Sequence, residues 1–301
     1  MNVSSRRIPA FLVAALLIPT FLEAETPVDK SCQASSDGAV EINVLAGQLT
    51  ITGWDEDRIS VTGTAGDEIE ELVVECGAGR SEIRAEIVRH EGRTTISNSK
   101  TRLEIHIPSR SAVEVETVSA SVSADRLRGA ASVGTVSGDV EVHGAPASLE
   151  VETVSGKIHV AEAVSPLSAE TVSGKIVLDT VTGRTHAASV SSEVKILGGE
   201  VEEGSFESVS GDVDFQGGVA GSGRLQAESH SGNVTLRLPT SVSADLRASS
   251  FSGSISNRLA GGENPTKSGV GGGDELRQTL GGGTARIEVE TFSGKILLVN
   301  G

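Results

Sequence analysis

Aromatic side chains are scarce in this chain, which has one Trp, six Phe and no Tyr among 301 residues. Any folded core must therefore rely on the aliphatic side chains of Val, Ile, Leu and Ala. The scarcity weighs against a carbohydrate-cleaving β-helix, although that class stays open. For the one indole, Trp54, we expect a capping or packing role rather than ligand stacking.

Basic residues are too few to balance the acidic ones. The chain has 25 Lys and Arg against 41 Asp and Glu, a formal net charge of −16. A field of this sign repels phosphate backbones, so nucleic acid is not expected as a partner. It also repels the anionic surface of a membrane. The charge suits a protein that is soluble after export.

Helical periodicity is absent beyond the first two dozen residues, and the chain holds 36 Gly. Glycine costs about 1 kcal/mol inside a helix, so this composition argues against helices. The sequence therefore predicts an all-β fold.

One long apolar run occurs, from Ile8 to Leu22, and it is too short for a bilayer core, which needs about 20 residues. Two arginines precede this run and Ala24 follows it, which is the order of a secretory signal peptide. We therefore assign residues 1–24 to a signal peptide and expect no membrane span after cleavage. An uncleaved anchor stays open, because Leu22 occupies a position where cleavage favours a small residue.

Cysteine is nearly absent as well, since the chain contains Cys32 and Cys76 alone. In an oxidising compartment an even count permits one disulfide. By closing the loop between the two cysteines, this candidate disulfide would stabilise the folded protein by about 3–4 kcal/mol in the chain-entropy model. Two unpaired cysteines are the alternative, because the sequence does not show how far apart they lie.

The chain is rich in internal sequence repeats. A hexapeptide of the form TVSGKI recurs nine times, and its first five copies start 18 residues apart. The later steps are 19, 21, 21 and 41 residues. Such self-similarity is the signature of a stacked repeat architecture. The nine copies start at Thr117, Thr135, Thr153, Thr171, Ser189, Ser208, Ser229, Ser250 and Thr291.

Each copy has alternating apolar and polar residues on both sides of its centre. In one repeat Leu149, Val151 and Thr153 alternate with glutamates, and a second alternation begins at Ile158. The parity changes between the two, so the chain must turn a corner there, where Gly would allow φ > 0. The last residue of each hexapeptide should fill the interior; these residues are Val122, Val140, Ile158, Ile176, Val194, Val213, Val234, Ile255 and Ile296.

The serine and glycine of each corner should form ladders down one edge of the stack. If the corner is buried, each serine hydroxyl needs a partner, which the neighbouring rung can supply. We expect structural hydroxyls rather than nucleophiles, because no general base accompanies the serines. The candidate turn ladder comprises Ser137, Gly138, Ser155, Gly156, Ser173, Gly174, Ser210, Gly211, Ser231, Gly232, Ser252, Gly253, Ser293 and Gly294.

These units predict a single-stranded parallel β-helix, or β-solenoid, with rungs of about 18 residues, because so short a unit buries its apolar face only against neighbours. Right-handed winding is favoured, and left-handed winding stays open. Residues 25–110 are expected to form an irregular N-terminal β cap that includes a covering hairpin over Glu70–Val88. Residues 111–301 should form the repeats, in one continuous domain with the cap. Within them, Gly261–Gly283 predicts a flexible loop rather than a degenerate rung.

Several stretches also carry a resemblance to a known family. They are GQLTITGWDEDRISVTG (Gly47–Gly63), LEIHIPSRSAVEVETVSA (Leu103–Ala120), the TVSGKI-type turns and the final GTARIEVETFSGKILL. With these the chain resembles a bacterial family of β-strand-repeat domains of unknown function, labelled putative adhesins and related to head-GIN-type auto-transporter adhesin domains. The resemblance covers nearly all of the chain after the signal peptide. It implies an exported β-solenoid and supplies no catalytic residues.

No catalytic, cofactor-binding or metal-binding residues are expected. The six histidines are scattered without the spacing of a metal motif such as HExxH. A catalytic carboxylate pair cannot be singled out among 41 acidic residues.

We therefore expect an exported, non-catalytic, adhesin-like interaction or structural module of the cell envelope. Solenoids expose long binding faces, so the expected partner is an envelope protein or a surface glycan. An envelope-stress regulatory or sensor domain is the first alternative, and a polysaccharide-active β-helix enzyme is the second. The periplasm, the cell surface and the extracellular medium of a bacterium are all open as locations, and so is the oligomeric state.

Overall fold

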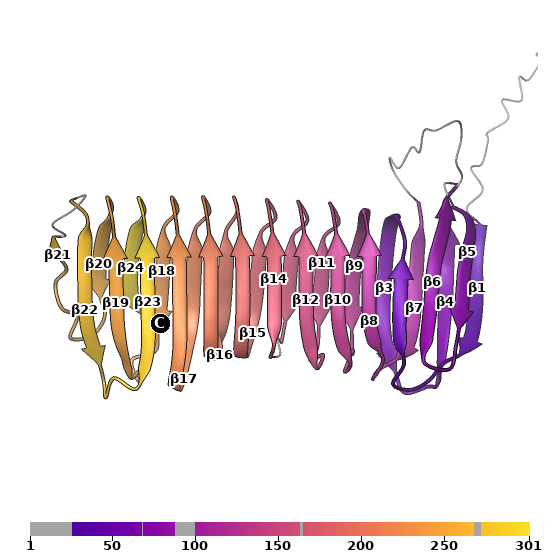
Figure 1. Ribbon diagram of the computed structural model, residues 1–301, viewed down its shortest axis with the longest axis horizontal. Coiled ribbons are helices and arrows are strands. Elements are labelled where there is room, and N and C mark those ends of the chain that lie inside the picture. Colours follow the sequence, from indigo (N-terminus) through magenta and orange to yellow (C-terminus); the bar gives the residue numbers. More distant parts are fainter. Residues whose placement is uncertain (1–25, 68, 88–99, 163–164, 268–271) are drawn as a thin grey trace, which may run out of the picture.

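The computed structural model describes residues 26–67, 69–87, 100–162, 165–267 and 272–301 (Figure 1). Within these ranges every regular element is a β-strand, which confirms the predicted all-β class. The predicted signal peptide, residues 1–24, lies outside the described residues. Among the described residues no helix has the length and hydrophobicity that a bilayer crossing requires.

The strands stack into an elongated solenoid whose central rungs each contribute one strand to each of two walls (Figure 1). We call the wall that contains the residues before each corner the first wall. In stacking order it holds β5 (Ile69–Cys76), β6 (Arg80–Ile87), β2 (Ala39–Asn43), β8 (Ala112–Thr117), β10 (Ala130–Thr135), β12 (Ser148–Thr153), β14 (Leu167–Thr171), the second halves of β15 (Ile176–Ser189), β16 (Val194–Ser208) and β17 (Val213–Ser229), then β23 (Ala285–Thr291), β19 (Ala244–Ser250), β22 (Asp274–Leu280) and β21 (Thr266–Lys267).

The second wall contains the residues after each corner. In stacking order it holds β1 (Thr26–Gln33), β4 (Arg58–Ala65), β7 (Arg102–Pro108), β3 (Ala46–Trp54), β9 (Ser119–Asp125), β11 (Val140–His143), β13 (Ile158–Ala161), the first halves of β15, β16 and β17, then β18 (Val234–Leu238), β24 (Lys295–Asn300) and β20 (Ser254–Arg258). The long strands β15, β16 and β17 pass from this wall to the first one.

Like positions of successive rungs lie directly above one another. Thr117 pairs with Thr135, and Thr135 pairs with Thr153, in parallel ladders that continue to Thr171 and Ser189. Adjacent strands of a sheet lie about 4.8 Å apart, so each repeated residue forms a row along the solenoid with that spacing. The predicted β-solenoid is therefore confirmed.

The interior is aliphatic, as the composition requires. All nine residues that close the hexapeptides are buried, from Val122 to Ile296. Full burial of such a side chain contributes about 1.5–3 kcal/mol. Two of the few aromatic residues, Phe206 and Phe215, also lie in this interior with ring centroids 5.5 Å apart. The stack therefore has one continuous apolar core.

Stacking order departs from chain order at both ends. The rung of β23 and β24 lies between the rung of β17 and β18 and the rung of β19 and β20. This placement accounts for the step of 41 residues, because the chain passes this level and later returns to it. At the other end β2 and β3 lie between the β6–β7 level and the β8–β9 level. Residues 25–110 thus contain one regular rung in addition to covering strands.

Antiparallel strands cover the two ends of the first wall. The hairpin of β5 and β6 lies where the sequence predicts a covering hairpin. The prediction of a loop over the Gly-rich segment 261–283 is wrong for Asp274–Leu280, which forms β22 antiparallel to β19. The reason is an apolar alternation inside that segment, because Leu276 and Leu280 are buried against the last rung.

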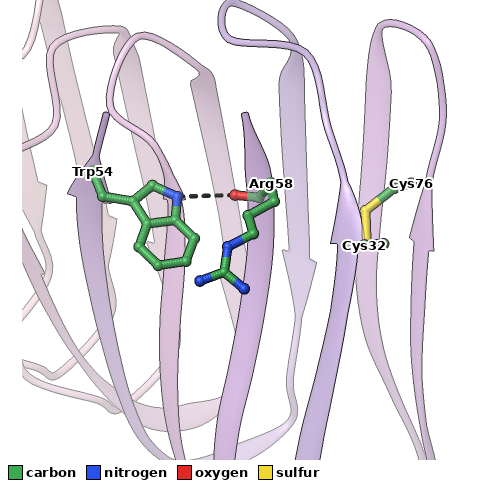
Figure 2. The surroundings of a disulfide bond; sticks show 4 residues. All are labelled: Cys32, Trp54, Arg58 and Cys76. Carbon is green, nitrogen blue, oxygen red and sulfur yellow. Dashed lines mark hydrogen bonds between the residues drawn. A yellow bond between two sulfur atoms is a disulfide. The ribbon is translucent and has the colours of Figure 1, made fainter. Parts of the chain in front are cut away.

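The N-terminal end is held by a disulfide and by Trp54 (Figure 2). Cys32 and Cys76 are bonded, with their Cα atoms 6.0 Å apart, and they join the outermost strands of the two walls, β1 and β5. The indole nitrogen of Trp54 donates a hydrogen bond to the carbonyl oxygen of Arg58 at 2.9 Å. The Arg58 guanidinium lies 4.7 Å from the centre of the indole ring. These contacts give Trp54 a packing role in the cap.

Candidate functional site

The corner of each rung is built around a buried threonine or serine. The hydroxyl of Thr153 accepts a hydrogen bond from the backbone amide of Gly156 at 2.9 Å. The same contact occurs between Thr171 and Gly174 at 2.9 Å and between Ser229 and Gly232 at 2.8 Å. A small side chain with an oxygen at this position therefore fixes the corner. Sequence reasoning missed this role, although the restriction to Thr and Ser in all nine copies is the signal for it.

The serines of the predicted turn ladder are exposed rather than buried. Ser155 Oγ donates to the carbonyl oxygen of Val136 in the previous rung at 3.2 Å, and Ser173 Oγ donates likewise to Val154 at 3.2 Å. Ser137 and Ser252 make the equivalent contact. Ser210, Ser231 and Ser293 are also exposed and donate through their backbone amides to a neighbouring rung. The expected partner in the next rung is therefore present, although water reaches this edge.

Close approach explains the glycines of the ladder better than backbone conformation does. None of Gly138, Gly156, Gly174, Gly211, Gly232, Gly253 and Gly294 has a positive φ, so the expectation of φ > 0 at the corner is wrong. A Cβ atom on Gly156 would instead lie 1.8 Å from the carbonyl oxygen of Gly138. On Gly174 it would lie 1.7 Å from the carbonyl oxygen of Gly156. At these seven corners the rungs stack without room for a Cβ atom, whereas Ala120 and Ser192 take the equivalent position in the other two copies.

Apolar side chains form an exposed row next to these corners. The second residue of each copy points outward, and its side chain is between 38% and 49% exposed where it is Val or Phe. Exposed rows of this length are unusual, because monomeric proteins rarely leave large contiguous apolar patches in water. We call this row the apolar ladder; in stacking order it comprises Val118, Val136, Val154, Val172, Val190, Val209, His230, Phe292 and Phe251.

The C-terminal end of the apolar ladder is a stack of three rings. The His230 and Phe292 rings lie 4.9 Å apart between centroids, and the Phe292 and Phe251 rings lie 4.7 Å apart, both pairs nearly parallel. The interleaving of β23 between β17 and β19 creates this stack. It places Phe292 between the rings of His230 and Phe251, both of which are distant from Phe292 in sequence. Two of the four phenylalanines among the described residues, Phe251 and Phe292, therefore lie on the surface.

Carboxylates form a second row beside the apolar ladder, two residues earlier in six of the nine rungs; Gly134, Ala188 and Ser249 take that position in the other three. We call it the acidic row; its members are Glu116, Glu152, Glu170, Glu207, Glu228 and Glu290. Glu228 pairs in register with both Glu207 and Glu290, so three carboxylates follow one another directly. Within the part of the chain that the structure describes, one ion pair is made by this row, between His186 and Glu170 at 3.6 Å.

Glu228 has the most perturbed environment of the acidic row. Partial burial raises the pKa of its carboxyl, and the negative charges of Glu290 and Glu207 raise that pKa further. Both effects disfavour the ionised form, because desolvation and like charges act in the same direction on a carboxylate. The acidic row therefore concentrates uncompensated negative charge around Glu228.

The two rows line a shallow groove that follows the first wall. Its volume is about 1120 Å³, and it runs from Glu116 to the ring stack at Phe251. The outward face of the second wall is different, because its charges are mixed and partly paired. There Lys175 bonds Glu193 at 2.6 Å, and Arg237 pairs with Asp214. The carboxylates that line the groove thus belong to the first wall, whose outward face also carries Arg224 and Arg286 outside the acidic row.

The sequence could have indicated this groove. Continuing the alternation from Leu149 through Thr153 places Glu152 and Val154 on the outward side, beside each other. Because the alternation changes parity at the corner, the sequence pattern alone does not assign Val154 to either side. Among the described residues, no cluster of His, Cys, Asp and Glu has the arrangement of a metal site.

Comparisons with known proteins concern the fold. No curated protein sequence matches the chain. Solved structures similar to it include a putative adhesin from Bacteroides fragilis, 10% identical, covering 92% of this chain and 99% of that one with a TM-score of 0.44. A putative lipid binding protein from Parabacteroides distasonis is 18% identical, covering 91% of this chain and 97% of that one with a TM-score of 0.42. A putative cell adhesion protein from Clostridium sporogenes is 13% identical, covering 92% and 100%, with a TM-score of 0.27.

One family model matches most of the chain, residues 39–298, and it describes the Toastrack DUF4097 domain. The match spans the interleaved rungs at both ends and all of the corners between them. It agrees with the resemblance to a β-strand-repeat family of unknown function and with the solenoid described above. This chain belongs to the Toastrack DUF4097 family.

Proposed function

We propose that this protein is an exported, non-catalytic interaction module of the bacterial cell envelope that binds a partner along the groove of the first wall. The observation that carries the proposal is the apolar ladder, whose Val and Phe side chains stay in water while the apolar rows of the interior are buried. Exposed apolar patches of this kind mark interaction sites in soluble proteins. Solenoids in general use such long, repeated surfaces for binding.

The rigidity of the groove supports the same proposal. Each of the nine hexapeptide corners is fixed by a hydrogen bond from a backbone amide to a buried hydroxyl, as in the Thr153–Gly156 pair. Ladder side chains are therefore held at fixed spacing before any partner arrives. A preformed surface loses little conformational entropy on binding, which favours affinity.

A polysaccharide-active enzyme is the second candidate, and Glu228 is the observation that favours it. A carboxyl with a raised pKa beside ionised carboxylates is the arrangement that glycoside hydrolysis uses. The acidic row weighs against this reading, because it repeats along the wall without one distinct acid and base pair. Incubation of the purified protein and its Glu228→Gln variant with neutral and acidic glycans tests it. Product that appears with the wild type alone would establish the enzyme.

Export is tested on the mature protein. Cleavage after Ala24 would leave Glu25 as the first residue, which mass spectrometry of the protein from its native cells would detect. Cell fractionation would then assign the periplasm, the surface or the medium. A mature protein that retains residues 1–24 and stays in the cytoplasm would overturn this part of the proposal.

Binding is tested by site-specific photocrosslinking in the native cells. A photoreactive residue is placed at Val172 on the apolar ladder and, as a matched control, at Leu197, an exposed apolar residue of the second wall. We expect one defined adduct from position 172 and none from position 197. The partner in that adduct is then identified, purified and tested for direct binding. Equal adduct patterns from both positions, or no adduct from either, would contradict the proposed function.

A further inference from the structure

We propose that the partner in this groove is a cationic, amphipathic helical segment of a polypeptide, anchored on the ring stack of Phe251, Phe292 and His230. This inference rests on the proposed function and adds the chemical class of the partner to it.

The acidic row and the apolar ladder lie side by side along the first wall. Glu152 and Val154 are two residues apart on the same side of their strand, so one rung offers a carboxylate and an apolar group about 7 Å from each other. The arrangement repeats in the rungs of Glu170 and of Glu207. A partner that matches both rows needs cationic and apolar groups in two adjacent stripes.

Charge complementarity with the acidic row requires a positively charged partner. Glu207, Glu228 and Glu290 follow one another in the acidic row, and none of them has an ion pair with a described residue. Burial raises the pKa of the Glu228 carboxyl, and the charges of Glu290 and Glu207 raise it further. Lys or Arg side chains of a partner would relieve the repulsion among these carboxylates, because opposite charges within a few ångströms stabilise the ionised carboxylates.

The ring stack supplies the anchor. Phe251 and Phe292 are 44% and 47% exposed, and their rings stack on each other. Glu290 is exposed near the end of β23, and Phe292, two residues later and just past that strand, is exposed as well. A partner arginine can therefore lie over an aromatic face while it pairs with a carboxylate, a combination that guanidinium groups favour. Buried aromatic anchors commonly dominate interface energetics.

Other occupants fit the groove less well. A second copy of the same face would bring two acidic rows together, which the net charge of −16 makes unfavourable. Nucleic acid and anionic membrane surfaces carry the same sign of charge as the row. A neutral glycan could stack on the rings but would leave the carboxylates unpaired. A helix that lies along the groove repeats its side chains every 5.4 Å per turn, close to the rung spacing of about 4.8 Å, so that three successive turns stay near three successive rungs.

The test uses the full mature protein and a dye-labelled 18-residue helical peptide of Lys and Leu, with Leu at positions i, i+3, i+4 and i+7. Fluorescence anisotropy should show saturable binding that weakens as salt rises, since exposed charge pairs are screened. Three control peptides have a scrambled order, Glu in place of Lys, or Lys without Leu. We expect each control to bind at least about tenfold more weakly, because each lacks one of the two stripes or its sign.

Variants of the protein locate the site. The double variant Phe251→Ser/Phe292→Ser should weaken peptide binding at least about tenfold, as loss of a hot spot does. Glu228→Gln/Glu290→Gln should weaken it and flatten its salt dependence. Leu197→Ser and Glu104→Gln, exposed positions of the second wall, are the matched controls and should bind as the wild type does. Val172→Ser serves as a second ladder variant in case the phenylalanine variant unfolds, and thermal unfolding is recorded for all of them.

Equal binding of the wild type and the ladder variants, equal binding of the scrambled peptide, or preference for the Glu peptide would each overturn the inference. If photocrosslinking places a partner at Val172 while the peptide fails to bind, the proposed function stands and the cationic helical partner is wrong. If the peptide binds at the ladder but no native partner crosslinks there, the groove has this chemistry and the proposed function fails.

Discussion

The backbone amide of Gly156 donates a hydrogen bond to the side-chain hydroxyl of Thr153 at 2.9 Å. Thr153 is buried, so neither group can turn to water if its partner is lost. Because the contact recurs in the other corners, it holds the surface rows as well as the fold.

Thr153→Val should destabilise the protein. The substitution keeps the shape of the side chain but leaves the Gly156 amide without an acceptor, which costs about 1–3 kcal/mol for a buried group. The free energy of unfolding from urea denaturation measures the effect. Thr153→Ser is the control, because serine occupies the same position in the rungs of Ser208 and Ser229 and keeps the oxygen. Equal stability of the Val and Ser variants would refute the role of the hydroxyl.

Gly156→Ala should also destabilise the stack, for a steric reason. The new methyl group would lie 1.8 Å from the carbonyl oxygen of Gly138, so two rungs would have to separate. Overpacking of this kind costs about 1–3 kcal/mol, or more where the backbone cannot move. Gly221→Ala is the matched control, because a Cβ atom there meets nothing within 4 Å. The control should be unchanged or slightly stabilised by its smaller unfolded-state entropy, and a loss as large as that of Gly156→Ala would contradict the argument.

Removing the disulfide should loosen the N-terminal end before the rest. Cys32 and Cys76 are 44 residues apart in sequence and connect β1 with β5, the last strands of the two walls. The double variant Cys32→Ser/Cys76→Ser should lose about 3–4 kcal/mol in the chain-entropy model. Hydrogen exchange should accelerate in β1 and β5 first and leave the central strands β12 and β14 protected. Uniform acceleration over the whole stack would show that the disulfide does not act locally.

Glu228 should make stability depend on pH. Its pKa is raised in the folded protein, by burial first and then by neighbouring carboxylates, so the folded state binds the proton more tightly than the unfolded state does. Stability attributable to this group therefore falls as pH rises from the unfolded pKa, about 4.3 for Glu, through the higher folded value. The loss is complete above the folded pKa.

Glu228→Gln is expected to remove that loss. The variant should denature at a higher temperature than the wild type near neutral pH, and the gap should close below about pH 4, where both states of the wild type are protonated. Glu116→Gln is the control, because Asn43 and Gly134 are its neighbours in the row and carry no charge. A gap that persists at low pH would assign the effect to packing instead of charge.

The central rungs could be derived from the sequence in some detail. The 18-residue period set which residues stack, and the alternation around Leu149 and Ile158 separated interior from exterior. That alternation placed Glu152 outside, and continued past Thr153 it would place Val154 there too, but the predicted corner includes Val154. The hydrogen bonding of the corner could be predicted only in part from the sequence, because the burial of Thr153 and the exposure of Ser155 depend on the path of the turn.

The sequence by itself determined the repeat, its period, its apolar interior and the excess of negative charge, because these follow from side-chain alternation and composition within one unit. Tertiary structure alone decided which unit lies next to which at the two ends. Near-identical copies can pair with one another in many orders, and local pattern does not distinguish among them. That choice placed Phe292 between His230 and Phe251, set Glu290 against Glu228, and brought Cys32 to Cys76. The repeated Glu and Val positions of the groove therefore follow from the sequence. The ring stack at its end exists only because of the order in which the rungs stack.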